Sequence, residues 1–351
     1  MRVDELKNKI LQLAIQGKLV PQDPNDEPAS VLLERIKEEK KQLIKEKKIK
    51  KEKPLPEISE EEKAFEIPKG WEWCRLADIT NSLILNDGDW ILSENMSELG
   101  EVKLIQLGSI GYGEYIYKGF KNISEETFIE LKCREINTGD ILINRLLGKK
   151  LYACILPKIE GKKITSVDTC FIKPNEKIYK TKFILYTVLS KYFQDKVFER
   201  IGGTTRQRIS KGNLIRIPFP LPPLEEQKRI VAKVDELFSI IDKLSENKES
   251  LSKNIDITRD KVLQLAIQGK LVPQDPDDEP ASVLLEKIKK EKEQLIKEKK
   301  IKKEKPLPEI SEEEKSFEIP KGWEWVRSSE IFNVRSAMRI HKTDWKEDGI
   351  P

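Results

Sequence analysis

Two stretches of the sequence gather side chains that could bind an anionic ligand. "GGTTRQRISKGN" (residues 202–213) and "NRLLGKK" (residues 144–150) contain no acidic residue. Arginine offers a planar fork of donors that suits guanine edges and phosphates, and glycine lets the backbone approach a ligand closely. Two acid-free basic loops in one domain indicate a nucleic-acid surface. The residues that we predict to form it are Arg145, Lys149, Lys150, Gly203, Thr204, Thr205, Arg206, Gln207, Arg208 and Lys211.

The residues that most enzymes need are scarce. His341 is the single histidine, which excludes a histidine-based triad or a multi-histidine metal site within one chain. The sequence has no phosphate-binding P-loop and no dinucleotide-binding glycine motif. "IPFPLPPLEEQ" holds a Pro-Pro pair but lacks the flanking residues of an amino-methyltransferase motif. We therefore predict no catalytic residue, no cofactor and no metal.

Composition predicts long solvated helices beside a smaller packed domain. Charged residues make up 36% of the 351 residues, above the usual quarter of a globular protein, and the net charge is only +4. The four cysteines form no C-x-x-C pair, which favours reduced thiols. No window resembles a signal peptide or a membrane span. We expect a soluble, cytoplasmic protein with no membrane association.

A long repeat organises the chain. Residues 11–75 return as residues 263–327 with six differences, at Asn25, Arg35, Glu38, Lys41, Ala64 and Cys74. Between the copies lies a unique segment, about residues 77–217. We predict a helical scaffold region (1–66), a compact domain (67–222), a long helix with the repeated scaffold (223–318), and the start of a second domain (319–351). We expect no ordered structure from about Ser328 onward.

The segment from Leu224 carries a sustained heptad pattern, which predicts coiled-coil packing over about 45 residues, or roughly 65–70 Å. A single amphipathic helix on a core is the alternative. The predicted seam consists of Ile230, Val234, Leu237, Ile241, Leu244, Leu251, Ile255, Val262 and Leu265. The N-terminal helix, beginning near Val3, could pack against this long helix. The basic run of residues 34–53 is typical of a solvated helix face, with phosphate contact as the sharper alternative.

The unique segment predicts a mixed helix-and-sheet domain, so the fold class is α+β on a long antiparallel coiled-coil scaffold. Strand-like apolar runs cover residues 101–107, 140–146, 151–157 and 168–174, and helical spacing covers 181–201. We expect Trp71 and Trp73 to pack the domain onto the scaffold. Packing is also the favoured role of Trp90 and Tyr112, over contact with bases.

Three stretches together resemble one family. They are "IPKGWEWCRL" at the start of the domain, "GGTTRQRISKGNLIRIPFPLPPLEEQKRIVAKVDELF" at its end, and the repeated "QGKLVPQDPNDEPASVLLE". The chain is similar over nearly its whole length to DNA-specificity subunits of type I restriction–modification systems. The resemblance implies two target-recognition domains at opposite ends of paired antiparallel helices, each reading half of a bipartite site on double-stranded DNA. It also implies a subunit without activity of its own that recruits adenine-N6 methyltransferase subunits and ATP-dependent nuclease (restriction) subunits.

The sequence departs from the family pattern because only one recognition domain is complete. An exposed heptad seam needs a partner, and a two-fold homodimer would supply one and read an inverted repeat. We therefore expect a homodimer of half-subunits. The alternatives are a silent, phase-variable remnant of a full subunit, and a coiled-coil assembly protein that does not bind DNA. "RLLGKK" is not the glycine-rich turn that the family often has, so the family assigns the 202–211 loop to DNA more firmly than the 145–150 loop.

Overall fold

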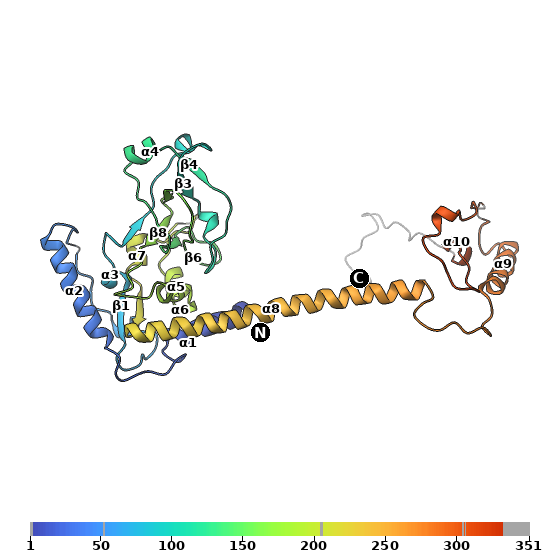
Figure 1. Cartoon of the computed structure of the whole chain (residues 1–351), viewed down its shortest axis with the longest axis horizontal. Coiled ribbons are helices and arrows are strands. Elements are labelled where there is room, and N and C mark those ends of the chain that lie inside the picture. The colour runs from blue at the N-terminus through green and yellow to red at the C-terminus, as the bar shows by residue number, and fades with distance from the viewer. Residues whose placement is uncertain (1–2, 52, 204–205, 304, 306, 333–351) are drawn as a thin grey trace, which may run out of the picture. The chain divides into compact units, whose positions relative to one another are not determined.

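The computed structural model describes residues 3–51, 53–203, 206–303, 305 and 307–332 (Figure 1). The chain divides into two compact units, Met1–Ser245 and Glu246–Pro351, and the division falls inside one long helix. The helices are α1 (Val3–Ile15), α2 (Ala29–Lys45), α3 (Leu76–Ile79), α4 (Glu125–Glu130), α5 (Thr181–Leu189), α6 (Lys191–Phe198), α7 (Lys211–Leu214), α8 (Leu224–Ile267), α9 (Ala281–Lys297) and α10 (Ser328–Ile331). The strands are β1 (Glu72–Arg75), β2 (Leu85–Asp87), β3 (Val102–Ile105), β4 (Lys121–Ile123), β5 (Ile141–Asn144), β6 (Tyr152–Ile155), β7 (Lys163–Thr165), β8 (Thr169–Ile172) and β9 (Pro218–Leu221). This mixture of helix and sheet with one long helix confirms the predicted fold class.

The unique segment folds around a four-stranded antiparallel sheet in the order β2-β8-β5-β6. Its central strands read as continuous apolar runs because both faces are covered, and Ile141, Leu142 and Ile143 are fully buried. A second sheet, in the order β4-β3-β7, pairs β3 with β7 in parallel. The four predicted strand regions are confirmed as β3, β5, β6 and β8.

The predicted helix over residues 181–201 was wrong in one respect, because it is two helices. Ser190 has an extended backbone (φ −62°, ψ 148°), and its hydroxyl accepts a hydrogen bond from the Phe193 N–H. A serine in this position is a good N-cap, so α5 ends and α6 begins there. Both helices still pack on the sheet, with Phe183 and Phe193 buried in the same core.

The domain leaves and rejoins the scaffold at one place. β1 and β9 form a two-stranded antiparallel ladder in which Cys74 pairs with Phe219. Trp71, just before β1, is buried, and Trp73 packs edge-on against Tyr192 at 5.9 Å between ring centroids. The prediction that both tryptophans pack the domain onto the scaffold is confirmed.

In the first unit, α1 lies antiparallel to the first half of α8 (Figure 1). The Lys7 Nζ lies 2.5 Å from a carboxylate oxygen of Asp242, whereas Gln22, beyond the end of α1, bonds to Glu226. Later residues of the N-terminal segment therefore contact earlier residues of α8, so α1 and α8 run antiparallel. α1 buries Ile10, Leu11, Ala14 and Ile15, the helical spacing of one face. The expected pairing of the N-terminal helix with α8 is confirmed for this unit.

The second unit contains the repeated scaffold, with helix bounds that match those of the first copy. α9 corresponds to α2, and α10 to α3. The expectation of no ordered structure from Ser328 was wrong for α10: the Glu330 carboxylate accepts a hydrogen bond from the Arg327 N–H at 2.9 Å and caps the turn. Residues 333–351, and His341 with them, lie outside the described residues.

Candidate nucleic-acid interface

The structure brings the two predicted basic loops together. The chain that leaves β5 pairs with the end of the 202–208 loop through a bridge between Leu146 and Arg208. The Leu147 N–H donates to the Gln207 carbonyl at 2.9 Å, and the Ile209 N–H donates to the Arg145 carbonyl at 3.1 Å. Two loops that are about 60 residues apart in sequence therefore form one continuous surface, held by backbone hydrogen bonds.

The two ends of the 202–208 loop pair with each other. Gly202 and Arg208 exchange two backbone hydrogen bonds of 3.1 and 3.0 Å. Gly203 has a φ of +91°, and a Cβ atom there would lie 2.5 Å from the Arg206 carbonyl oxygen. Glycine is therefore required at this position, by backbone conformation and by space. The predicted residues Thr204 and Thr205 lie outside the described residues.

Two predicted arginines are anchored on one turn between β7 and β8. The Arg145 guanidinium donates to the Val167 carbonyl at 2.6 Å, and that of Arg208 donates to the same oxygen at 3.3 Å. Arg208 also lies 3.1 Å from an Asp168 carboxylate oxygen. The Arg208 side chain is 39% exposed, whereas Arg145 as a residue is 5% exposed. Arg145 thus supports the loop from beneath, and Arg208 retains a solvent-facing part.

Carboxylates that sequence inspection missed lie among these basic groups. Asp87, at the end of β2, has one oxygen 3.0 Å from Arg145 and the other 3.7 Å from the Lys211 Nζ. The order β2-β8-β5 places Asp87 beside the end of β5, although 57 positions separate it from Asn144. The loops are free of acidic residues in sequence, but the surface is not. The Asp87 and Asp168 carboxylates offset part of the positive charge and hold their basic partners in place.

A third carboxylate pairs with a basic residue that lies outside the two predicted loops. The Arg134 guanidinium lies 3.4 Å from an Asp89 carboxylate oxygen and within 3.4 Å of the Asp87 carbonyl. Burial raises the pKa of Asp89, while the hydrogen bond from the Arg134 N–H and the Arg134 charge lower it. Arg134 therefore joins the rim of the same surface from the segment after α4.

Lys149, Arg206 and Gln207 are exposed on these loops. Lys150 points elsewhere: its ammonium lies 4.4 Å from the centre of the Tyr112 ring and 3.9 Å from the Asp4 carboxylate on α1. The predicted residues thus include exposed side chains, side chains held in ion pairs, and Lys150, which is directed toward the scaffold. The outward groups are the ones that could reach a ligand without first breaking an ion pair.

Trp90 is the clearest aromatic departure from expectation. The packing prediction for Trp90 was wrong, because 68% of the residue is exposed, three positions after Asp87. The packing prediction for Tyr112 is confirmed: its hydroxyl donates to the Leu189 carbonyl at 2.5 Å and lies 3.1 Å from the Asn8 amide oxygen. No sequence pattern distinguishes these two aromatics, since both follow a glycine-containing turn.

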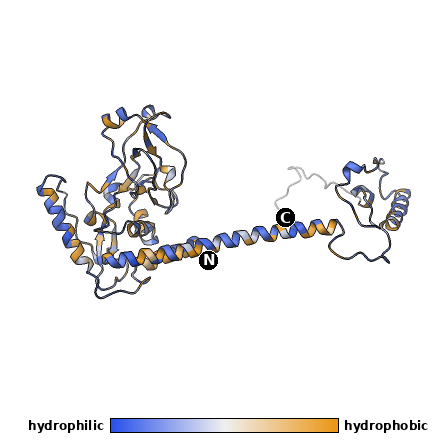
Figure 2. Ribbon diagram, viewed as in Figure 1, coloured by the Kyte–Doolittle hydropathy of each residue, from blue (hydrophilic) through white to orange (hydrophobic). Residues whose placement is uncertain are grey.

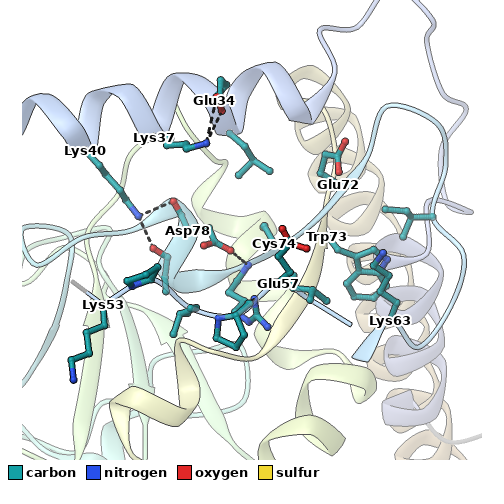
Figure 3. Close-up of a pocket in the computed structure, with 18 of the residues that line it drawn as sticks. Glu34, Lys37, Lys40, Lys53, Glu57, Lys63, Glu72, Trp73, Cys74 and Asp78 are labelled. Carbon is teal, nitrogen blue, oxygen red and sulfur yellow. Dashed lines mark hydrogen bonds and ion pairs between the residues drawn. The ribbon is translucent and has the colours of Figure 1, made fainter. Parts of the chain in front are cut away.

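A wide groove lies between α2, residues 51–67 and β1 (Figure 3). Its lining mixes lysines with Glu34, Glu57, Glu72 and Asp78, and Lys40 donates to the Ala77 and Asp78 carbonyls. A counterpart in the second unit runs from Leu307 to Glu330. Its recurrence and its balanced charge mark the groove as part of the scaffold fold. The charges of α2 pair along the helix, as Lys37 does with Glu34, which fits a solvated helix face.

The heptad seam is covered along part of its length. Ile230, Val234 and Ile241 are buried in the core of the first unit, with Leu237 packed at its edge. Leu244 is 61% exposed. In the second unit Leu251, Ile255 and Val262 are exposed and Leu265 is half-buried. Figure 2 shows hydrophobic positions recurring along this later part of α8.

The described residues contain no cluster of three or more histidine, cysteine or acidic side chains suited to a metal ion. All four cysteines are buried free thiols, and burial raises the pKa of Cys154 and of Cys170 to about 12. Thiols with such pKa values are poor nucleophiles at neutral pH. None of the described helices is both long and apolar enough to span a bilayer.

Several known proteins are similar to this chain. Residues 68–253 match the family described as "Type I restriction modification DNA specificity domain". The specificity subunits of the type I restriction enzymes EcoAI and EcoEI, both from Escherichia coli, are 37% and 34% identical over 98% and 94% of the chain, which spans 64% and 62% of their lengths. The crystal structure of the HsdS subunit from Thermoanaerobacter tengcongensis aligns with 69% of this chain and 57% of that one at 19% identity, with a TM-score of 0.40. The chain is a member of the family of type I restriction–modification DNA specificity proteins.

Proposed function

We propose that this chain recognises double-stranded DNA through the surface that the β5–β6 loop and the 202–208 loop form together. The observation that carries the proposal is the pairing of Leu146 with Arg208, which makes one basic rim from two loops. Relatives that are 37% and 34% identical to this chain are named specificity subunits, which supports a recognition role without catalysis.

The groups on this surface divide the work of recognition. Lys149 and Arg206 are exposed and suited to phosphates, which supply most of the affinity but no sequence information. Gln207 and Arg208 carry the side chains that could form paired hydrogen bonds with adenine and guanine edges. Arg145 acts as a positioning residue, because its guanidinium is buried on Val167 and Asp87. The exposed Trp90 extends the rim beyond Asp87.

The remaining parts of the proposal concern assembly. The chain reads one half of a bipartite DNA site, pairs with a second copy through the exposed part of its seam, and recruits adenine-N6 methyltransferase subunits and restriction subunits. Support comes from Leu251, Ile255 and Val262, whose exposed apolar side chains recur at heptad spacing. A two-fold pair would present two identical domains and would read an inverted repeat.

The first experiment is to co-express the chain with a cognate adenine methyltransferase subunit and to map methylated adenines on a plasmid. A split palindromic motif that depends on the chain would support the paired half-subunit. A non-palindromic motif would point to a second specificity chain. A complex that assembles without any motif would favour the silent remnant.

The second experiment tests the surface itself on DNA that carries the mapped motif. We expect the double variant Lys149→Ala/Arg206→Ala to bind at least about tenfold more weakly at moderate salt. The slope of log affinity against log salt should become shallower by about two, since each lost phosphate contact removes nearly one counterion.

The matched control is Lys228→Ala/Lys233→Ala, which removes two exposed lysines from α8 and leaves the loops intact. Equal losses of affinity in both variants would show that the overall charge of the chain, and not the two loops, accounts for the effect. Unchanged binding in the loop variant would contradict the DNA surface and favour the alternative of a protein-assembly module, which the exposed seam also fits.

A further inference from the structure

The guanidinium of Arg208 is held along one edge. Its Nε lies 3.1 Å from an Asp168 carboxylate oxygen, and its Nη2 donates to the Val167 carbonyl at 3.3 Å. Within the described residues, the other terminal nitrogen, Nη1, has no hydrogen-bond or ion-pair partner, and the side chain is 39% exposed. A guanidinium has five N–H groups. The edge formed by Nη1 and the second N–H of Nη2 therefore stays available to a ligand.

The two groups that hold this guanidinium are themselves fixed. The turn between β7 and β8 is closed by a hydrogen bond from the Thr169 N–H to the Ser166 carbonyl at 2.9 Å. The Arg145 N–H donates to the Asp168 carbonyl at 2.8 Å, and the Arg145 guanidinium donates to the Val167 carbonyl at 2.6 Å. The plane of the donors is thus set before a ligand arrives, and a pair of donors set in advance loses little conformational entropy on binding.

Two parallel donors on this edge require two adjacent acceptors. In the major groove, guanine offers two, O6 and N7, whereas adenine places a donor beside N7 and thymine places a methyl group beside O4. A phosphate also offers two acceptors, but its attraction for a cation depends on charge, which Asp168 offsets at Arg208. The ion pair therefore preserves the directional donors of Arg208 and weakens its attraction for phosphate.

We propose that Arg208 reads a guanine in the major groove through Nη1 and Nη2, and that Asp168 is the positioning residue that directs it. This inference rests on the proposed function and names the base that one residue of the surface recognises. It also separates Arg208 from Arg206, which is exposed on the same loop. Arg206 contributes affinity for any sequence, and Arg208 contributes preference for one base.

The test uses the full chain, with the co-expressed methyltransferase subunit, and duplexes that carry the mapped methylation motif. Each guanine of the motif is replaced in turn by 7-deazaguanine, which lacks the N7 acceptor, and by inosine, which keeps N7 and O6. We expect one position at which 7-deazaguanine weakens binding by about tenfold and inosine changes it by less than about twofold. In Arg208→Ala, 7-deazaguanine at that position should change binding by less than about twofold.

Arg206→Ala is the matched control, because it removes an exposed arginine from the same loop. It should weaken binding to the parent duplex and to the 7-deazaguanine duplex by the same factor. The ratio of the two affinities should therefore remain about tenfold, as in the unchanged chain.

Asp168→Asn tests the positioning role. The ratio of the two affinities should fall by at least about threefold, because the guanidinium loses its charged partner. Binding to DNA without the motif should strengthen at the same time, since a negative charge is removed beside Arg208. A variant that is merely misfolded would lose both kinds of binding, so the two opposite changes report positioning.

The results that overturn this inference differ from those that overturn the proposed function. If no guanine of the motif is sensitive to 7-deazaguanine, or if the sensitivity persists in Arg208→Ala, Arg208 does not read guanine, although the DNA surface stands. If Asp168→Asn strengthens binding to every duplex and leaves the ratio unchanged, Arg208 contacts a phosphate and the inference is wrong. Equal binding of the unchanged complex to DNA with and without the motif would contradict the proposed function itself.

Discussion

The two scaffold copies differ at six positions over 65 residues, yet their environments differ greatly. Leu32 is 2% exposed in the first copy, whereas its equivalent Leu284 is 54% exposed in the second. α2 buries three of its residues, and α9 buries none. In contrast, the helix bounds are the same in both copies. The hydrogen bond from the Ala29 N–H to the Gly70 carbonyl recurs between Ala281 and Gly322. The ring contact of Phe65 with Trp73 recurs between Phe317 and Trp325.

This difference separates what local sequence determines from what partners determine. Capping residues, prolines and helical spacing reproduce the helices and turns in both copies. The strand and the buried core require segments outside the repeat, namely β9 and the start of α8. Most of the stabilisation of the first copy should therefore come from its partners, since apolar burial is the main favourable contribution to folding.

The largest expected effect compares the two equivalent tryptophans. Trp71→Ala should lower the free energy of unfolding of the first unit by about 3–5 kcal/mol, because it empties a buried site and removes one of the two donors to Glu226, leaving the Gln22 amide. Trp323→Ala should cost less than about 1 kcal/mol, since the side chain is already partly solvated. Urea unfolding of both variants measures the difference. Equal losses would show that Trp323 is buried in solution by a partner.

A smaller effect concerns pH and is confined to the unique domain. Burial raises the pKa of Asp140 from 3.8 to about 6, although the Asn137 N–H donates to its carboxylate at 2.8 Å. Because the pKa of Asp140 is higher in the folded state, its protonated carboxyl group stabilises the fold. This stabilisation is fully present below about pH 4 and is lost as pH rises through 6. Stability should therefore fall by on the order of 2–3 kcal/mol from pH 4 to 7 through this group.

Asp140→Asn should remove that part of the pH dependence, as urea unfolding between pH 4 and 7 would show. Parallel curves for the two proteins would contradict the assignment to Asp140. In the described part of the second unit, two carboxyl groups have pKa shifts of the opposite sign. Hydrogen bonds from Lys300 and Arg327 lower the pKa of Glu298 and of Glu314, respectively. The contributions of these two exposed groups should thus change with pH in the opposite sense to that of Asp140.

The smallest effect tests a position where the copies differ. Arg35 pairs with Glu27, and Lys287 pairs with Glu279 at 2.8 Å. Both pairs are exposed, so Arg35→Lys and Lys287→Arg should each change the free energy of unfolding by less than about 0.5 kcal/mol. The measurement is the same urea titration, at low and at high salt. A change above about 1 kcal/mol that persists in high salt would mean that this pair is shielded from solvent.

Sequence patterns predicted the elements whose signals are local. Apolar runs bounded by glycine and proline gave β3, β5, β6 and β8, and heptad spacing gave α8. β9 was missed because "PFPL" has few backbone donors and pairs with a strand far away in the chain. The break at Ser190 was missed because serine also fits within a helical pattern until its side chain is seen to cap the next turn.

The candidate site was predictable in composition and not in arrangement. That loops 145–150 and 202–211 are basic is evident in the sequence, but their pairing through Leu146 and Arg208 depends on the sheet order. The same order brings Asp87 to Arg145, which no count of charges along one loop could show. The exposure of Trp90 is likewise a property of the assembled domain.

The ladder between β1 and β9 has a consequence for how such proteins change. Because the unique segment departs from and returns to neighbouring strands, its two ends are held side by side. A segment with adjacent ends is equivalent to a domain inserted into the scaffold. Another domain of different length could be joined at the same two strands without shifting the helices. Binding preference could then be exchanged as a unit while the framework that carries it keeps its geometry.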